Sequence, residues 1–342
     1  MRNLVTRYQE LNDDSRRAEV VGYHRKPNPV FRDKASQSEI AGLKSEDRTN
    51  VSFNGEEYES KFTIGFEIEK DHFHRDALQE YPLFCGFESD SSCGVEAVTH
   101  VLPLVGKSMW RTKVFNMFVE AKRIIDDEYS PTNGQCGGHI TLACKGMDGE
   151  ELTNRVRKFS GILYSVFRKR LVNGFCYKNP FMIADEPHTD YSTTTFGKYV
   201  ICKNTGFGIE FRLPSKVTSV KQLMRRYELM YLIMDYAINK PDARSSFYRA
   251  VKPILMSMYE KDEVKVDAII GLAKHFQKML DNGKVGKATI GWIEGWWSRT
   301  NCRVGRNDIT RTRNLPVNPQ WSSTRNWTDV RREWIEANRV LR

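Results

Sequence analysis

Apolar and polar residues alternate in several short stretches of the chain. In the stretch 62–69 the apolar positions Phe62, Ile64, Phe66 and Ile68 alternate with Thr63, Gly65, Glu67 and Glu69. Because successive side chains of a strand point to opposite sides, this alternation predicts a strand with one apolar and one polar face. The same pattern recurs in the stretches 95–102, 137–143 and 208–213. Together the stretches predict a sheet whose apolar face packs on helices.

Other stretches carry apolar residues at helical spacing. Residues 150–175 form one broad apolar stripe, and residues 218–238 repeat that pattern with Thr218 or Ser219 as the N-cap. Further helices are predicted at 244–258, 262–281 and 327–340. The first 60 residues are polar and contain only short apolar runs. The prediction is an α+β protein with a partly irregular N-terminal lead-in (1–60), a core (61–240) and a basic, Trp-rich helical C-terminal region (241–342).

The polar side of the predicted strands carries residue types that bind metals or phosphates. They are Glu67, Glu69, Glu96, His139, Glu210 and Arg212, and the segment 87–90 adds Glu88 and Asp90 at a strand end. Neighbouring carboxylates on one strand face repel each other unless a cation lies between them. The first stretch on its own is equally compatible with a solvated strand, but a solvated face usually carries Lys, Thr, Ser and Gln as well. The recurrence therefore favours a ligand-binding face.

The residue types on this face also indicate which ligand it binds. Several carboxylates with one histidine suit Mg²⁺ or Mn²⁺ better than a closed zinc site, which favours Cys and more His. Arg212, close to Glu210, suits the negative charge that develops on a transferred phosphoryl group. The chain contains no GxxxxGK[ST] motif and no Gly-rich dinucleotide fingerprint, which argues against a P-loop or dinucleotide domain.

Cysteine content and hydropathy bear on the compartment. The seven cysteines are an odd number without a CxxC pair, which favours reduced thiols. No apolar run approaches the roughly 20 residues that span a bilayer, and the N-terminal segment lacks the apolar centre of a secretory signal. These features predict a cytosolic location.

Five motifs, in this order, resemble those of the amidoligase family, which comprises carboxylate–amine ligases related to glutamate–cysteine ligase and glutamine synthetase. They are GFEIE (65–69), ESDSSCGVEAVTHVLPL (88–104), GGHITLA (137–143), RLVNGFCY (170–177) and GIEFRLPS (208–215). The resemblance covers residues 61–240. It implies an antiparallel, curved, funnel-like sheet with helices on its convex face and with ATP and Mg²⁺ on its concave face. It also implies that ATP converts a carboxylate to an acyl phosphate, which an amine attacks to form an amide.

The resemblance assigns a role to each matching residue. Glu67, Glu69, Glu96 and Glu210 would be metal ligands, His139 would lie beside the metal-bound phosphates, and Arg212 would contact the phosphoryl group. Asp90 would lie on the substrate side, and Arg170 would contact a carboxylate or a phosphate. Thr141 stands where many family members have a second histidine. The substrates stay open among a free amino acid, a short peptide, a cell-wall peptide and a protein side chain.

Net charge introduces a competing interpretation. The chain carries +10, from 53 basic and 43 acidic residues, and its last 42 residues hold nine arginines against four acids. Arginines interleaved with Trp297, Trp321, Trp327 and Trp334 are compatible with binding to single-stranded nucleic acid, although a helical cap with inward tryptophans is favoured. A third interpretation is a structural protein on a degenerate ligase fold. The full set of carboxylates argues against it.

Overall fold

The structure, a computed structural model, describes residues 18–23, 25, 60–168, 170, 191–192 and 201–281. These residues fall into two compact units, each treated by itself below. The first unit holds the residues up to Leu152 together with Thr205–Asp235, and the second holds Thr153–Asn204 and the residues from Tyr236 onward. Several predicted features lie outside the described residues: most of the lead-in, the Trp- and Arg-rich stretch and the helix at 327–340.

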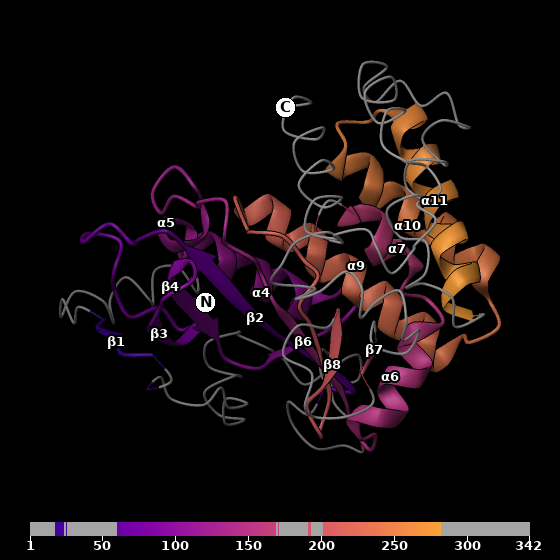
Figure 1. Ribbon diagram of the computed structural model, residues 1–342, viewed down its shortest axis with the longest axis horizontal. Coiled ribbons are helices and arrows are strands. Elements are labelled where there is room, and N and C mark those ends of the chain that lie inside the picture. The colour runs from indigo at the N-terminus through magenta and orange to yellow at the C-terminus, as the bar shows by residue number, and fades with distance from the viewer. Residues whose placement is uncertain are drawn as a thin grey trace, which may run out of the picture. The chain divides into compact units, whose positions relative to one another are not determined.

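A mixed, open β-sheet forms the centre of the first unit (Figure 1). Its strands are β1 (Val20–Val21), β2 (Phe62–Lys70), β3 (Phe84–Asp90), β4 (Gly94–Thr99), β5 (Leu102–Pro103), β6 (Ile140–Cys144) and β9 (Ile209–Phe211). They lie in the order β1-β3-β4-β2-β6-β9, and β5 pairs with β2.

Most neighbouring strands of this sheet are antiparallel, as predicted, but β1 runs parallel to β3. The expectation of a wholly antiparallel sheet is therefore wrong at this edge. β1 comes from a distant part of the chain, so no hairpin fixes its direction.

The two faces of β2 differ as the alternation predicts. Its apolar side chains, from Phe62 to Ile68, are all buried. The Phe66 ring meets the Phe118 ring of helix α4 (Met109–Glu120) edge-on, with centroids 5.9 Å apart. Phe118 in turn contacts Tyr227 of helix α9 (Val220–Asn239), at 6.4 Å. Helices α4 and α9 therefore cover the apolar face of the sheet, and the polar face lies on the other side.

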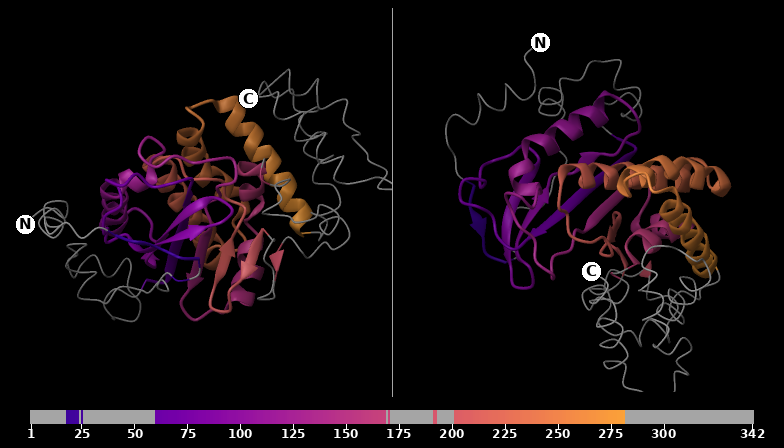
Figure 2. Two further views of the ribbon diagram at one scale, coloured as in Figure 1. Left: turned by 60° about the vertical axis from the view of Figure 1, so that its left-hand side comes forward. Right: turned by 90° about the horizontal axis from the view of Figure 1, so that it is seen from above.

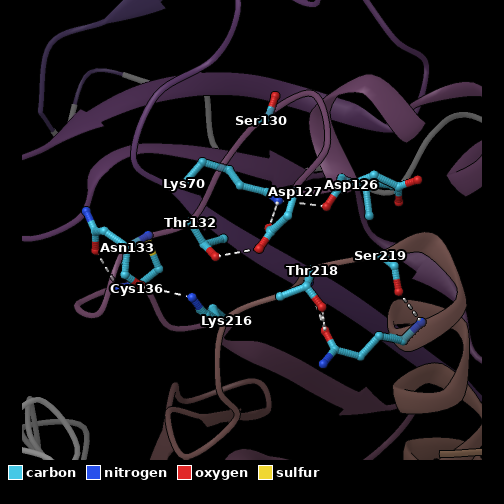
Figure 3. Close-up of polar contacts among 12 residues, drawn as sticks. Lys70, Asp126, Asp127, Ser130, Thr132, Asn133, Cys136, Lys216, Thr218 and Ser219 are labelled. Atoms are coloured by element: carbon cyan, nitrogen blue, oxygen red, sulfur yellow. Dashed lines mark hydrogen bonds and ion pairs between the residues drawn. The ribbon is translucent and has the colours of Figure 1, made fainter. Parts of the chain in front are cut away.

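Lys70, at the end of β2, falls on the apolar side and is fully buried. Its Nζ donates to the carbonyl of Ile125, the last residue of helix α5 (Lys122–Ile125), at 2.7 Å, and to Asp127 Oδ1 at 2.9 Å (Figure 3). The neighbouring carboxylate of Asp126 accepts from the backbone N–H of Val220, at 2.7 Å. The segment after α5 therefore joins the end of β2 to the first turn of α9.

The second unit is mainly helical. It contains the end of α6 (Gly149–Arg157), α7 (Gly161–Val166), the last residues of α9, α10 (Arg244–Met258), α11 (Glu263–Asp281) and a short parallel pair of strands, β7 (Tyr191–Ser192) and β8 (Cys202–Asn204). Figure 2 shows α10 and α11 in orange to yellow. The predicted helices at 218–238, 244–258 and 262–281 are confirmed.

The single helix predicted at 150–175 is wrong, because the chain turns between α6 and α7 at residues 158–160. Gly161 begins α7 at a close contact with α11, where a Cβ would lie 2.4 Å from the Ala273 carbonyl oxygen. Within the described ranges, none of the helices combines the length and the apolar character that crossing a membrane requires.

Candidate metal site

Acidic residues of three neighbouring strands lie directly opposite one another on the polar face of the sheet. Glu69 of β2 pairs with Glu96 of β4, and Glu96 pairs with Glu88 of β3. Directly opposite residues of antiparallel strands share a face and have closely spaced Cβ atoms. All three residues are buried, and Glu88 is only 1% exposed. The sheet therefore holds a row of three glutamates that water screens only weakly, which confirms the shared face predicted for Glu69 and Glu96.

A second group lies on the same face, at Glu67, two residues before Glu69 in β2. The Glu67 N–H donates to the His139 carbonyl at 3.0 Å, which places His139 opposite Glu67 just before β6. Glu210 of β9 pairs with Thr141 of β6, two residues beyond His139. Three strands that are distant in the sequence thus bring two carboxylates and one imidazole together.

The side-chain distances within this group are short. His139 Nδ1 lies 2.6 Å from Glu67 Oε2 and 3.8 Å from Glu210 Oε1. One ligand atom from each of Glu67, His139 and Glu210 lies within 4.8 Å of the other two, the one such grouping of three found in the described part of the chain. Ligands around a cation with bonds of 2.0–2.1 Å are about 3–4 Å apart. The group has the size and the donor set of a divalent cation site.

Glu69 connects this group with the row of glutamates. Its Oε1 lies 3.5 Å from His139 Nε2, and its Oε2 accepts from the Gly137 backbone N–H at 2.5 Å. The N–H fixes the orientation of the carboxylate and leaves Oε1 directed at the imidazole. Glu69 therefore adjoins the group of Glu67, His139 and Glu210.

Charge around His139 shifts its protonation. Burial lowers the pKa of His139 and so does Arg212, but the hydrogen bond to Glu67 and the negative charges of Glu67 and Glu69 outweigh them and raise it. The surrounding carboxylates therefore favour the protonated form of the ring. A divalent cation supplies the same positive charge, and the ring then has to be neutral to coordinate it.

Arg212 follows β9 and contacts the Glu210 carboxylate. Burial lowers the pKa of Arg212, but Glu210 and Glu67 raise it above the ordinary arginine value. The guanidinium therefore stays charged at the edge of the group, where it can attract an anion.

The backbone before His139 is packed against another segment of the unit. A Cβ on Gly138 would lie 2.7 Å from the Ser215 carbonyl oxygen and 2.9 Å from Arg226 Nη1. Arg226 is buried in α9 and donates to the carbonyls of Ser215, at 2.6 Å, and Lys216, at 2.8 Å. The absence of a side chain at Gly138 leaves room for Ser215 and Arg226, and Arg226 holds the backbone of Ser215 and Lys216 against this glycine. That positioning role of Arg226 was missed, although a charged residue amid the apolar positions of α9 is a signal for it.

Two further residues were predicted to belong to the site, Asp90 in the first unit and Arg170 in the second. Asp90 is at the end of β3, where its Oδ1 accepts from the backbone N–H groups of Ser92, at 2.6 Å, and Cys93, at 3.2 Å. Its carboxylate stabilises the turn between β3 and β4. Arg170 is buried in the second unit, and the rest of its motif, 171–177, lies outside the described residues. The roles predicted for both residues stay predictions.

Glu88, which the sequence places only at a strand end, belongs to the row with Glu96 and Glu69.

No family model matches the chain, and no curated protein or solved structure matches it either.

Proposed function

We propose that the protein is a Mg²⁺- or Mn²⁺-dependent enzyme that uses ATP to join a carboxylate to an amine. The observation that carries the proposal is the convergence of Glu67, His139 and Glu210, from three strands, on a space of cation size. Hard oxygen donors suit Mg²⁺ and Mn²⁺, and such sites commonly hold nucleotide phosphates. The proposal includes a curved, funnel-like core like that of the amidoligase family, with the ligands on its concave face.

The residues around the group match the needs of phosphoryl transfer. Bound Mg²⁺ supplies positive charge that neutralises the phosphates of ATP. Arg212 stabilises negative charge on the phosphoryl group as it moves to the substrate carboxylate, and Glu210 holds the guanidinium in position. The Thr141 hydroxyl, on the same face between Gly65 and Glu210, is a further candidate phosphate contact. The amine then displaces phosphate from the acyl phosphate and forms the amide.

Cation binding tests the site directly. We expect wild-type protein to bind Mn²⁺ in a titration followed by the electron paramagnetic resonance of free Mn²⁺. Glu67→Gln keeps the size of the side chain but removes its charge, so Mn²⁺ affinity is expected to fall by about 10- to 100-fold or more. Glu128→Gln, at an exposed position, is the matched control and should bind like wild type. Equal affinity in wild type and Glu67→Gln would rule out the assigned site.

Trapping of an acyl phosphate tests the reaction. Protein, ATP and Mg²⁺ are incubated with pools of amino acids or short peptides as carboxylate donors, and hydroxylamine serves as the amine. A ligase yields hydroxamate and ADP in equal amounts, and omission of the donor pool, ATP or Mg²⁺ abolishes both products. ADP release without hydroxamate in every pool would contradict the ligase and indicate ATP hydrolysis alone.

A further inference from the structure

Two cysteines from separate segments meet beside the candidate metal site. Cys93 lies in the turn between β3 and β4, and Cys136 lies in the segment that leads to His139. Both are free thiols that are 2% exposed, and their side chains are hydrogen-bonded to each other. Hydrogen-bonding distance between two sulfurs is close enough for a disulfide to form with a small movement of either segment.

Asn133 holds both segments in this arrangement. Its Nδ2 donates to the Cys93 carbonyl at 2.8 Å, while its Oδ1 accepts from the Cys136 backbone N–H at 3.2 Å. The Asn133 backbone N–H also points at the Cys136 sulfur, at 3.4 Å, and Lys216 Nζ donates to the Asn133 carbonyl (Figure 3). One side chain therefore fixes the two cysteines relative to each other.

The two sulfurs are chemically unequal. The hydrogen bond between them lowers the pKa of Cys136 and raises the pKa of Cys93. Burial and Glu69 raise the pKa of both thiols, but the Asn133 N–H and Lys216 lower that of Cys136, whose pKa is lowered overall. A thiolate is the form that attacks oxidants, and a neighbouring thiol resolves the product. Although both side chains are buried, Gly134 and Gln135 next to Cys136 are exposed, so a small oxidant needs only a local movement to reach it.

We propose that Cys93 and Cys136 form an oxidisable pair whose disulfide weakens cation binding at the candidate metal site. With hydrogen peroxide as the oxidant, the Cys136 thiolate attacks one peroxide oxygen and forms a sulfenic acid while hydroxide leaves. The Cys93 sulfur then displaces the sulfenic oxygen, which leaves as water. In total the two thiols lose two electrons and two protons, and the peroxide becomes two molecules of water.

The link to the metal site is the residue that follows Cys136. The Gly137 N–H donates to Glu69 Oε2 and so orients the carboxylate beside His139. A disulfide bond is about 2.05 Å long, well below the separation of two hydrogen-bonded thiols. Its formation draws Cys136 toward Cys93 and moves the Gly137 N–H away from Glu69. This part of the proposal rests on the proposed function, because it assumes a cation at that site.

Peptide mapping tests the disulfide. The reduced full-length protein is treated with hydrogen peroxide, alkylated and digested without reductant. The expected result is one cross-linked peptide pair that contains Cys93 and Cys136, which is absent in Cys93→Ser and in Cys136→Ser. Cys144→Ser replaces another buried cysteine that is not in a disulfide, and it should still give the cross-link. A failure of wild-type protein to form it, or equal cross-linking through other cysteines, would overturn the proposal.

Mn²⁺ titration of the cross-linked protein tests whether the disulfide weakens cation binding at the site. We expect about 10-fold weaker binding after oxidation, restored by dithiothreitol, and no effect of peroxide on Mn²⁺ binding by Cys93→Ser. Unchanged Mn²⁺ affinity in fully cross-linked protein would refute the proposed effect of the disulfide on cation binding. Absence of Mn²⁺ binding in the reduced protein would instead refute the proposed function, and with it the effect of the disulfide on cation binding. The peptide map would still decide whether the disulfide forms.

Discussion

His139 is the residue on which the site depends most, because it contacts every carboxylate of the group. Its Nδ1 faces Glu67 and Glu210, and its Nε2 faces Glu69. The resemblance predicts a position beside metal-bound phosphates, and the structure places the imidazole at the centre of the group of Glu67, His139 and Glu210. A cation bound by this group would therefore compete with the proton on this ring.

Mn²⁺ binding should strengthen as pH rises. The pKa of His139 is raised above its ordinary value of about 6.5, so the ring keeps its proton to higher pH than an ordinary histidine and must lose it to coordinate a cation. We expect the Mn²⁺ dissociation constant to fall by up to about 10-fold per pH unit above about pH 6.5, until the raised pKa is passed. Calorimetry in buffers of different ionisation enthalpy would also report the released proton. A dissociation constant that is flat over this range would contradict the role of His139.

At the scale of elements, period-2 alternation located the strands that build the site, since side chains two apart share a face. Helix α4 was missed, although Trp110, Val114, Met117 and Phe118 recur at helical spacing. The stripe at 150–175 was read as one helix because the apolar spacing continues across the turn between α6 and α7. Periodicity reports which residues are buried, and it does not report a break that a neighbouring helix imposes.

The contact between α7 and α11 should not tolerate a side chain at Gly161. In Gly161→Ala the new Cβ would meet the Ala273 carbonyl at 2.4 Å and the Gln277 backbone nitrogen at 2.7 Å. We expect a loss of about 1–3 kcal/mol in the free energy of unfolding, despite the better helix propensity of alanine. Urea denaturation measures it. Gly134→Ala has open space around its Cβ and should change stability by less than about 0.5 kcal/mol, so equal effects would refute the packing argument.

At the scale of the whole molecule, the chain passes from the first compact unit to the second and back before the final helices. Every described residue of the candidate site and of the thiol pair belongs to the first unit. That unit also contains Glu120, at the end of α4, whose two carboxylate oxygens are buried and have no hydrogen-bond partner within the described residues. Burial raises the pKa of Glu120 to about 7.

Global stability should therefore decrease as pH rises through the range in which Glu120 ionises. The folded protein retains the proton that the unfolded chain releases near pH 4.5. The resulting loss in the free energy of unfolding therefore grows up to about pH 7 and is constant above it. Because the side chain is only half-buried, we expect Glu120→Gln to gain about 1 kcal/mol near pH 8 and nothing near pH 4. Thermal unfolding at both pH values measures the difference. A gain that is the same at both would show that ionisation of Glu120 is not its cause.

The sequence by itself determined the α+β class, the positions of the strands around the site, and which residues share their polar face. These features follow from local chain geometry, because neighbouring positions of a strand alternate and those of a helix repeat every 3.6 residues. Tertiary structure alone decided which of the acidic residues come together. Strand order and register bring Glu67, His139 and Glu210 into one group, place Glu88 opposite Glu96, and leave Asp90 in a turn. They also bring Cys93 to Cys136. Contacts between distant segments are set by the packing of the whole sheet, and no periodic pattern in the sequence marks them.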